Sequence, residues 1–266
     1  MKVVQHIAQA VGPRVSFEIL PPTKGSSIST LFEALDPLME FKPACINITN
    51  HQPEIEYRER PDGLLERRVV SKRPGTVAIA AAIMNHYRVD VVPHLICGGF
   101  SKEETENALI DLHYLGIQNI LLVRGDANPQ TGRFVPARDG HEHTIDLLRQ
   151  VIDLNRGVYL DRDLPMPEPT DFCAGVAGYP EKHIEAPNSE SDLCFLKAKV
   201  DAGAEYIVTQ MFFDNSKYFS FVEACRKAGI TVPVVPGLKP VSIRKHLNLL
   251  PQSFKVDLPP ELSKAI

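Results

Sequence analysis

Seven short apolar runs in this chain end on, or nearly on, a polar or charged side chain, and this pattern constrains the fold most. Helix-like segments separate most of the runs. A chain that alternates strands and helices builds a parallel sheet, and the loops after the strands carry the functional groups. We therefore predict an α/β fold of the (β/α)8 TIM-barrel type. The runs are Val15–Leu20, Cys45–Thr49, Val91–Cys97, Asn119–Asp126, Cys173–His183, Tyr206–Asp214 and Val232–Pro240.

Apolar stripes with helical spacing predict four of the intervening helices. Ser101 followed by Glu104 is a capping-box signal for the start of the first. Gly116, Gly203 and Gly229 stand where three of them should end. The stripes are Ala108–Leu115, Ile145–Ile152, Leu193–Val200 and Tyr218–Cys225.

The number of strands falls one short of a closed barrel, which needs eight. After the last run there is a helix-like stretch, Ser242–Leu250, and no further strand pattern. We expect residues 1–266 to form a single catalytic barrel domain that is incomplete at its C-terminus. His51–Pro61 and Gly157–Asp171 interrupt the alternation, and both are predicted to be loops.

Bulk composition excludes several classes of protein. The chain has 266 residues and a net charge of −4, which argues against a nucleic-acid partner. We expect neither a signal peptide nor a membrane span, because residues 1–6 lack the apolar core of a signal peptide and no apolar stretch is long enough to cross a bilayer. Its 5 cysteines are odd in number and lack C-x-x-C spacing, so we expect reduced thiols that fill the core of a cytoplasmic protein.

Glu18 is the leading candidate for acid–base chemistry. It interrupts the first apolar run, which Pro21 and Pro22 bring to an end. A carboxyl group in a partly desolvated pocket has a raised pKa and can act as a general acid. The competing interpretation is an acid at the end of a strand that forms a salt bridge.

Three further segments after strands carry polar groups. Arg124-Gly125-Asp126 offers a charged pair around a glycine that admits a flat ligand, or else a turn with a local ion pair. Gly178–Ala186 is dense in polar side chains and suits a binding loop or a structural loop. Gln210 has both a donor and an acceptor for the edge of a heterocycle.

His141-Glu142-His143 resembles a pair of metal ligands, but the segment precedes a helix and has no evident third ligand. We interpret it as the polar start of a helix and expect no metal site. The chain has neither G-x-G-x-x-G nor a P-loop, so a nucleotide cofactor would not be held by a Rossmann unit.

Taken together and in order, these segments resemble the methylenetetrahydrofolate reductase family. The similarity extends from about Val15 to Val241, and the ordered set is far more specific than any single piece. The matching segments are Ser16–Glu18 with Pro21-Pro22, Pro93–Leu95, Arg124–Asp126, Tyr179–Glu181, His183, Glu185-Ala186, Leu196–Ala204, Thr209-Gln210, Phe212–Asp214, and Pro236-Gly237 with Pro240.

The resemblance implies a flavoprotein barrel with non-covalent FAD. NADH or NADPH would reduce the flavin in a ping-pong scheme, and the flavin would reduce 5,10-methylenetetrahydrofolate to 5-methyltetrahydrofolate for methionine synthesis. We also expect a homo-oligomer.

By the family pattern, Glu18 would be the general acid, and Asp126 and Gln210 would bind the folate. At two departures the family's cofactor contacts are absent or replaced: Phe195 stands where many relatives have Asn, and Ala198 where they have Arg. The implied contacts to FAD or nicotinamide are Thr49, His94, Arg124, Gly125, Asp126, Tyr179, His183, Ala186, Asp192 and Lys199.

Three other functions stay open. The first is a flavin-free, pterin-binding barrel of the methyltransferase type. The second is a metal-dependent barrel hydrolase that uses His141 and His143. The third is a non-catalytic barrel subunit of a larger redox complex. The sequence does not distinguish NADH from NADPH, because it shows no ribose-reading motif.

Overall fold

The computed structural model describes residues 1–127 and 132–266. In it, each of the seven apolar runs overlaps a strand, so this prediction is confirmed. The strands belong to one sheet in the order β1-β2-β5-β6-β7-β8-β9, and the neighbouring pairs whose register is defined are parallel. Their bounds are β1 (Phe17–Ile19), β2 (Cys45–Ile48), β5 (Asp90–Ile96), β6 (Asn119–Val123), β7 (Cys173–Gly178), β8 (Tyr206–Thr209) and β9 (Val234–Val235).

Helices alternate with these strands, and the four that the apolar stripes predict are α4 to α7. The Ser101 hydroxyl accepts from the Glu104 N–H, and the Glu104 carboxylate accepts from the Ser101 N–H, as the capping box requires. Gly116 follows α4 with a φ of +73°, a conformation that suits glycine. The helices are α1 (Val3–Ala8), α2 (Ser29–Met39), α3 (Thr76–Tyr87), α4 (Lys102–Tyr114), α5 (Thr144–Asn155), α6 (Ser189–Asp201), α7 (Asn215–Lys227), α8 (His246–Phe254) and α9 (Pro260–Ala265).

The strand–helix alternation confirms the predicted α/β fold of the TIM-barrel type with seven strands. After β9 the described chain contains α8 and α9 and no eighth parallel strand. Helix α8 begins at His246, later than the Ser242 that the sequence suggests. None of the helices in the described ranges combines the length and the apolar character that a bilayer crossing requires.

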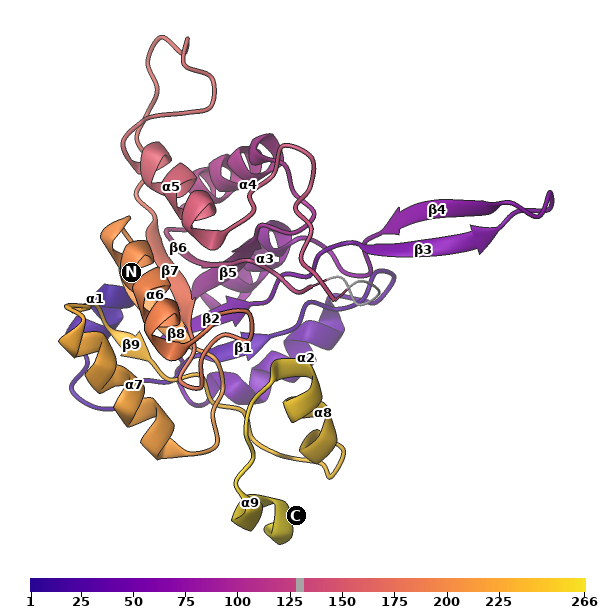
Figure 1. Ribbon diagram of the computed structural model, residues 1–266. Helices are drawn as coiled ribbons and strands as arrows, with labels where there is room; N and C mark the ends of the chain where they lie inside the picture. The colour runs from indigo at the N-terminus through magenta and orange to yellow at the C-terminus, as the bar shows by residue number, and fades with distance from the viewer. Residues whose placement is uncertain (128–131) are drawn as a thin grey trace. The chain divides into compact units, whose positions relative to one another are not determined.

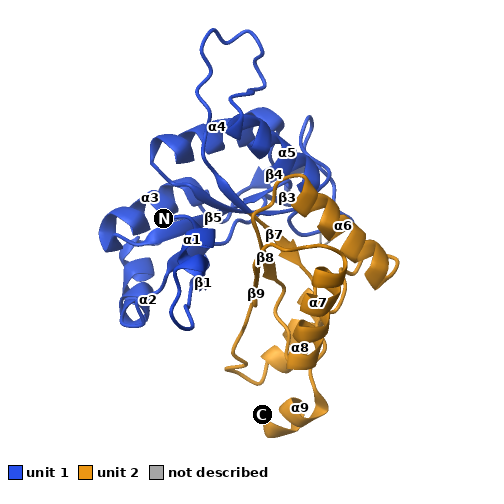
Figure 2. Ribbon diagram, turned by 90° about the vertical axis from the view of Figure 1, so that its left-hand side faces the viewer, with its two compact units in different colours: residues 1–174 blue, residues 175–266 orange. Residues whose placement is uncertain are grey.

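The chain divides into two compact units, which Figure 2 colours separately. Unit 1 is Met1–Ala174, and unit 2 is Gly175–Ile266. Each has its own buried residues: Ile46 and Leu122 are fully buried in unit 1, and Tyr206 and Ile207 are buried in unit 2. The single catalytic domain stays a prediction, and the units are described separately below.

The prediction of a loop at His51–Pro61 is wrong. Residues Glu54–Glu59 form β3, which pairs antiparallel with β4 (Leu65–Val70) in a separate two-stranded sheet (Figure 1). The turn contains Pro61, Asp62 and Gly63, with Gly63 at φ +79°. Pro-Asp-Gly between two β-rich segments is a hairpin signal that the polar composition obscured. The second predicted loop, Gly157–Asp171, contains neither helix nor strand.

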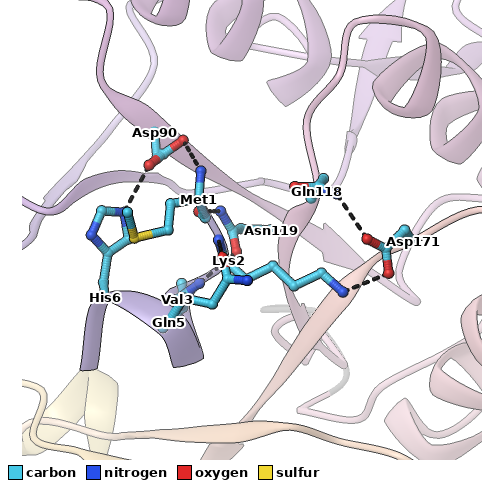
Figure 3. Close-up of polar contacts among 9 residues, drawn as sticks. All are labelled: Met1, Lys2, Val3, Gln5, His6, Asp90, Gln118, Asn119 and Asp171. Atoms are coloured by element: carbon cyan, nitrogen blue, oxygen red, sulfur yellow. Dashed lines mark hydrogen bonds and ion pairs between the residues drawn. The ribbon is translucent and has the colours of Figure 1, made fainter. Parts of the chain in front are cut away.

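Helix α1 is fixed to the amino ends of two strands in unit 1 (Figure 3). Asp90, the first residue of β5, pairs with the Met1 ammonium group at 2.8 Å and with His6 at 2.7 Å. Asn119, the first residue of β6, accepts the Val3 N–H at 2.8 Å and donates to the Met1 carbonyl at 2.9 Å. These contacts lie at the amino ends of β5 and β6, whereas barrel enzymes carry their active sites at the carboxyl ends of the strands.

All five cysteines are free thiols. Cys45, Cys97, Cys173 and Cys225 are buried, as predicted for core packing. Burial raises the thiol pKa of Cys45 and Cys225 to about 11 and that of Cys97 to about 12, so these thiols stay protonated and unreactive. Cys194 is exposed on α6, so for this residue the prediction of a core position is wrong.

Candidate functional site

The register of unit 1 places Glu18 and His94 on the same face of the sheet. Residues that pair directly in neighbouring strands share a face, and so do residues two apart along a strand. Glu18 pairs with Asn47 and Asn47 pairs with Val92. His94 lies two residues after Val92 and pairs with Leu121. Unit 1 therefore presents an acid and an imidazole on one face near the carboxyl ends of its strands.

Glu18 itself is exposed. The expectation of a partly desolvated pocket around it is wrong, because β1 is an edge strand that has only β2 beside it among the described residues. Thr49 follows β2, and its N–H and hydroxyl both donate to the Ile19 carbonyl, at 3.0 and 3.2 Å. Thr49 thus fixes the ends of β1 and β2 to each other next to Glu18.

His94 is the most deeply buried of the predicted site residues in unit 1, with 6% of its surface exposed. Its backbone carbonyl accepts from Asn50 and from Thr76, both at 3.2 Å. Burial, and secondly the charge of His51, lowers its pKa to about 4, so the ring is neutral at pH 7. Its buried Nε2 has no partner among the described residues. A buried ring nitrogen without a partner is a costly arrangement that a bound ligand can relieve.

The Arg124-Gly125-Asp126 segment lies beside the loop that follows β5. Gly125 has a φ of +91°, which favours glycine, and the Gly98 N–H donates to the Arg124 carbonyl at 3.1 Å. The Arg124 guanidinium carbon lies 5.0 Å from the centre of the Phe134 ring, a cation–π distance. The sequence did not identify Phe134 as a contact of Arg124, because Phe134 belongs to a loop without periodicity.

Gln52 connects this segment to the loop after β2. Its side-chain amide donates to the Asp126 carbonyl at 2.9 Å. Asp126 itself is exposed to solvent. Neither Asn50 nor Gln52 is among the site residues that the family resemblance implies. The structure shows that they fix the β2 loop to His94 within β5 and to Asp126 after β6.

In unit 2, the predicted cofactor residues form a connected set around the start of α6. The Asp192 carboxylate accepts the His183 N–H at 2.9 Å, and the Tyr179 and His183 rings meet edge to face with 4.7 Å between centroids. Lys182, at a φ of +78°, donates to the carbonyls of His183 and Ala186 at 2.9 and 2.6 Å. No sequence pattern indicated that Lys182 holds this loop in place.

Lys199 is one of the implied contacts to FAD or nicotinamide, but in the structure its ammonium group bonds to the protein backbone. The Nζ donates to the Ala177 carbonyl in β7 at 2.9 Å. Burial lowers the Lys199 pKa to about 8, while the Asp192 carboxylate opposes this effect. The two positions that depart from the family pattern, Phe195 and Ala198, are exposed on the same helix and add no charge.

A cleft of about 410 Å³ in unit 2 is lined by Tyr179 and Asp192. Lys182 and Lys217 also line it, together with Ser189 at the start of α6. His183, Ala186, Lys199 and Gln210 are not among the residues that line it. The cleft is therefore lined by two of the predicted cofactor contacts, Tyr179 and Asp192, and by two cationic side chains.

Gln210 continues the β7–β8 ladder, because its N–H donates to the Gly178 carbonyl at 2.8 Å. Its side-chain oxygen accepts the Met211 N–H at 2.9 Å, so that oxygen is engaged locally. Phe212 is buried and stacks on Tyr218 with 5.1 Å between centroids, so its ring packs within the protein.

The His141–His143 segment begins a helix, as predicted. His141 is buried, its Nε2 pairs with the Gln150 side chain at 2.5 Å, and burial lowers its pKa. His143 is the residue that precedes α5. Within residues 1–127 and 132–266, no group of three or more His, Cys, Asp or Glu is arranged to hold a metal ion.

These features define a TIM-barrel-type α/β protein with polar residues after its strands. A crystal structure of oxaloacetate acetylhydrolase shares this fold, with a TM-score of 0.51, 11% identity, and coverage of 97% of this chain and 88% of that chain. Similarity at this level of identity concerns the fold alone.

The sequence model described as methylenetetrahydrofolate reductase matches residues 2–266, and the chain belongs to this family. Methylenetetrahydrofolate reductase (NADH) 1 of Arabidopsis thaliana is 34% identical over 100% of this chain and 42% of its own length. The 5,10-methylenetetrahydrofolate reductase of Escherichia coli (strain K12) is 31% identical over 96% of this chain and 74% of its own length. A probable methylenetetrahydrofolate reductase (NADPH) of Caenorhabditis elegans is 30% identical over 92% of this chain and 34% of its own length. The chain thus spans less than half the length of the plant and nematode relatives.

Proposed function

We propose that this chain carries the catalytic part of a reductase that converts 5,10-methylenetetrahydrofolate to 5-methyltetrahydrofolate with NADH or NADPH. The family match over residues 2–266 carries the proposal. The relatives' names include both NADH and NADPH, so either donor is consistent with it. The product would serve methionine synthesis, and the protein would act in the cytoplasm as a homo-oligomer.

FAD is the proposed cofactor, and two features of unit 1 fit a flavin. The unpartnered Nε2 of His94 offers a buried hydrogen-bonding group, and the backbone at Gly125 is free of a Cβ beside Arg124. Unit 2 fits less completely, because Lys199 is bonded to Ala177. When bound, FAD would accept a hydride from the nicotinamide and release it to the methylene carbon of the folate, which makes the scheme ping-pong.

The proposed FAD or nicotinamide contacts are Thr49, His94, Arg124, Gly125 and Asp126 in unit 1, and Tyr179, His183, Ala186, Asp192 and Lys199 in unit 2. In unit 1, the charged pair Arg124 and Asp126 would orient flat rings next to the backbone of Gly125. In unit 2, Asp192 would bind hydroxyl groups through the carboxylate that now accepts from His183.

Glu18 is the proposed general acid. Opening of the five-membered ring of the folate needs a proton at the leaving nitrogen, and a carboxyl group supplies it best when its pKa lies near the working pH. Because Glu18 is exposed, the bound substrate would supply the desolvation that favours proton donation by a carboxyl group. Asp126 and Gln210 would hold the pterin by hydrogen bonds.

An anaerobic titration tests the proposal. The protein loaded with FAD is titrated with NADH and separately with NADPH while flavin absorbance is followed, and methylenetetrahydrofolate is then added. Bleaching by one nucleotide and recovery with the folate are expected. Protein that neither purifies with nor takes up FAD would instead favour a pterin-binding barrel of the methyltransferase type.

A further inference from the structure

The β3–β4 hairpin is a two-stranded ribbon that pairs with no other strand in the described ranges, and it extends outward (Figure 1). A ribbon of two strands is only marginally stable by itself, and its free edges are templates for further pairing. Large apolar side chains are also uncovered, since Tyr57 is 55% and Val69 is 61% exposed. Both features favour a partner strand at the edge of this hairpin.

The two faces of the hairpin differ in chemistry. One face carries the pairs Ile55–Val69, Tyr57–Arg67 and Glu59–Leu65, which are mainly apolar. The other carries Glu54–Val70, Glu56–Arg68 and Arg58–Glu66, in which two pairs oppose opposite charges.

The charges of β3 are complementary to those of a second copy of β3 that runs in the opposite direction. Residues 54–60 read Glu-Ile-Glu-Tyr-Arg-Glu-Arg, with acids before Tyr57 and bases at the mirrored positions after it. In an antiparallel pair of two copies centred on Tyr57, Glu56 faces the partner's Arg58, and Glu54 faces the partner's Arg60. The two-fold symmetry repeats both pairs. Opposite charges directly across an antiparallel ladder are stabilising.

The backbone of β3 is oriented for this pairing. The Arg60 N–H donates to the Leu64 carbonyl across the hairpin at 2.8 Å. Backbone groups alternate in direction along an antiparallel strand, so even-numbered residues bond to β4. Ile55, Tyr57 and Glu59 therefore direct their N–H and C=O groups toward the free edge.

We propose that two copies of this chain associate by antiparallel pairing of their β3 strands about Tyr57, which forms a four-stranded sheet in the order β4-β3-β3-β4. Across this sheet the charges alternate from Arg68 to Glu56, to the partner's Arg58, to the partner's Glu66. Parallel pairing in register would instead oppose like charges. Self-pairing of β4 about Arg67 would oppose two arginines. The interface is independent of the proposed reductase activity.

Cross-linking tests the register. In a Cys194→Ser background, which removes the exposed thiol, Tyr57→Cys places two thiols across the two-fold axis. Directly paired residues lie about 4.5–5.5 Å apart between Cα atoms, within the range that a disulfide bridges. Mild oxidation should give a covalent dimer. Val69→Cys is the matched control on β4 and should stay monomeric on a non-reducing gel.

A charge exchange tests the complementarity. E54R/E56R makes positions 54, 56, 58 and 60 all basic, and R58E/R60E makes them all acidic. Each variant should be monomeric by light scattering, and their mixture should regain twice the chain mass. Circular dichroism checks that both fold. A wild-type chain that is monomeric at its highest soluble concentration would overturn the proposal, as would equal cross-linking at positions 57 and 69.

Discussion

The ammonium group of Lys199 on α6 donates a hydrogen bond of 2.9 Å to the backbone carbonyl of Ala177 on β7. This contact connects a helix of unit 2 to the strand beneath it through a cation that is largely removed from water. The pKa of Lys199 falls to about 8 for that reason. A buried lysine with a lowered pKa makes stability depend on pH, because the unfolded chain binds the proton more tightly.

We predict that the free energy of unfolding rises with pH above 8 through Lys199. With a pKa of about 8 when folded and 10.5 as its ordinary value, the contribution gained between pH 8 and 10 is about 2 kcal/mol. Urea unfolding of the wild type and of Lys199→Met at these two pH values measures it. The difference between the two proteins should change with pH. Lys197→Met, on the same helix, is the control, and an equal pH dependence in all three proteins would contradict the prediction.

His94 should make the FAD-free protein sensitive to acid. Its folded pKa of about 4 lies below its ordinary value of 6.5, so stability is full above pH 6.5 and is lost as pH falls toward 4. The loss between pH 6.5 and 4.5 is about 2 kcal/mol. In denaturant unfolding, His94→Leu should not show this loss of stability at acid pH. His143→Leu, at an exposed position, should still show it. The same acid slope in His94→Leu and wild type would refute the assignment.

Replacement of Glu18 by Gln should separate the two half-reactions. The variant should still bind FAD and oxidise NADH or NADPH, because neither step needs a proton from Glu18. Folate reduction should slow by roughly 10²- to 10⁴-fold, the usual range for loss of a general acid. Stopped-flow absorbance of the flavin measures each half-reaction. Glu40→Gln, at an exposed position in unit 1, is the control. Equal loss of both half-reactions would contradict the role of Glu18.

A single methyl group at Gly175 should destabilise unit 2. A Cβ at this position would lie 2.3 Å from the ring of Tyr206, which is only 1% exposed, so the surrounding core would have to shift to admit the methyl group. Gly175→Ala should therefore cost about 1–3 kcal/mol, as overpacking of a core does. Gly12→Ala is the matched control, because a Cβ there meets no atom within 4 Å. The free energy of unfolding of this control should change by no more than about 0.5 kcal/mol. The urea unfolding midpoints of the two variants measure the difference. Similar midpoints would contradict the prediction and show that the Tyr206 ring adapts to the methyl group.

The sequence alone determined the alternation of seven strands with helices. Apolar runs, the Ser101–Glu104 capping box and glycines such as Gly116 act over a few residues, so their signals are complete in the local sequence. The same locality identified the polar residues after the strands, including Glu18 and the Arg124–Asp126 segment. What these residues contact was not available in that way.

Tertiary structure decided the partners and the burial of those residues. It exposed Glu18 on an edge strand, joined Lys199 to Ala177, placed Arg124 over Phe134 and left the His94 Nε2 without a partner among the described residues. It also formed the β3–β4 hairpin from a segment that lacks a buried face. Desolvation, cation–π contact and strand pairing depend on which distant segments meet. The local periodicity of the sequence carries no information about contacts between distant segments, so these contacts are determined only in the folded chain.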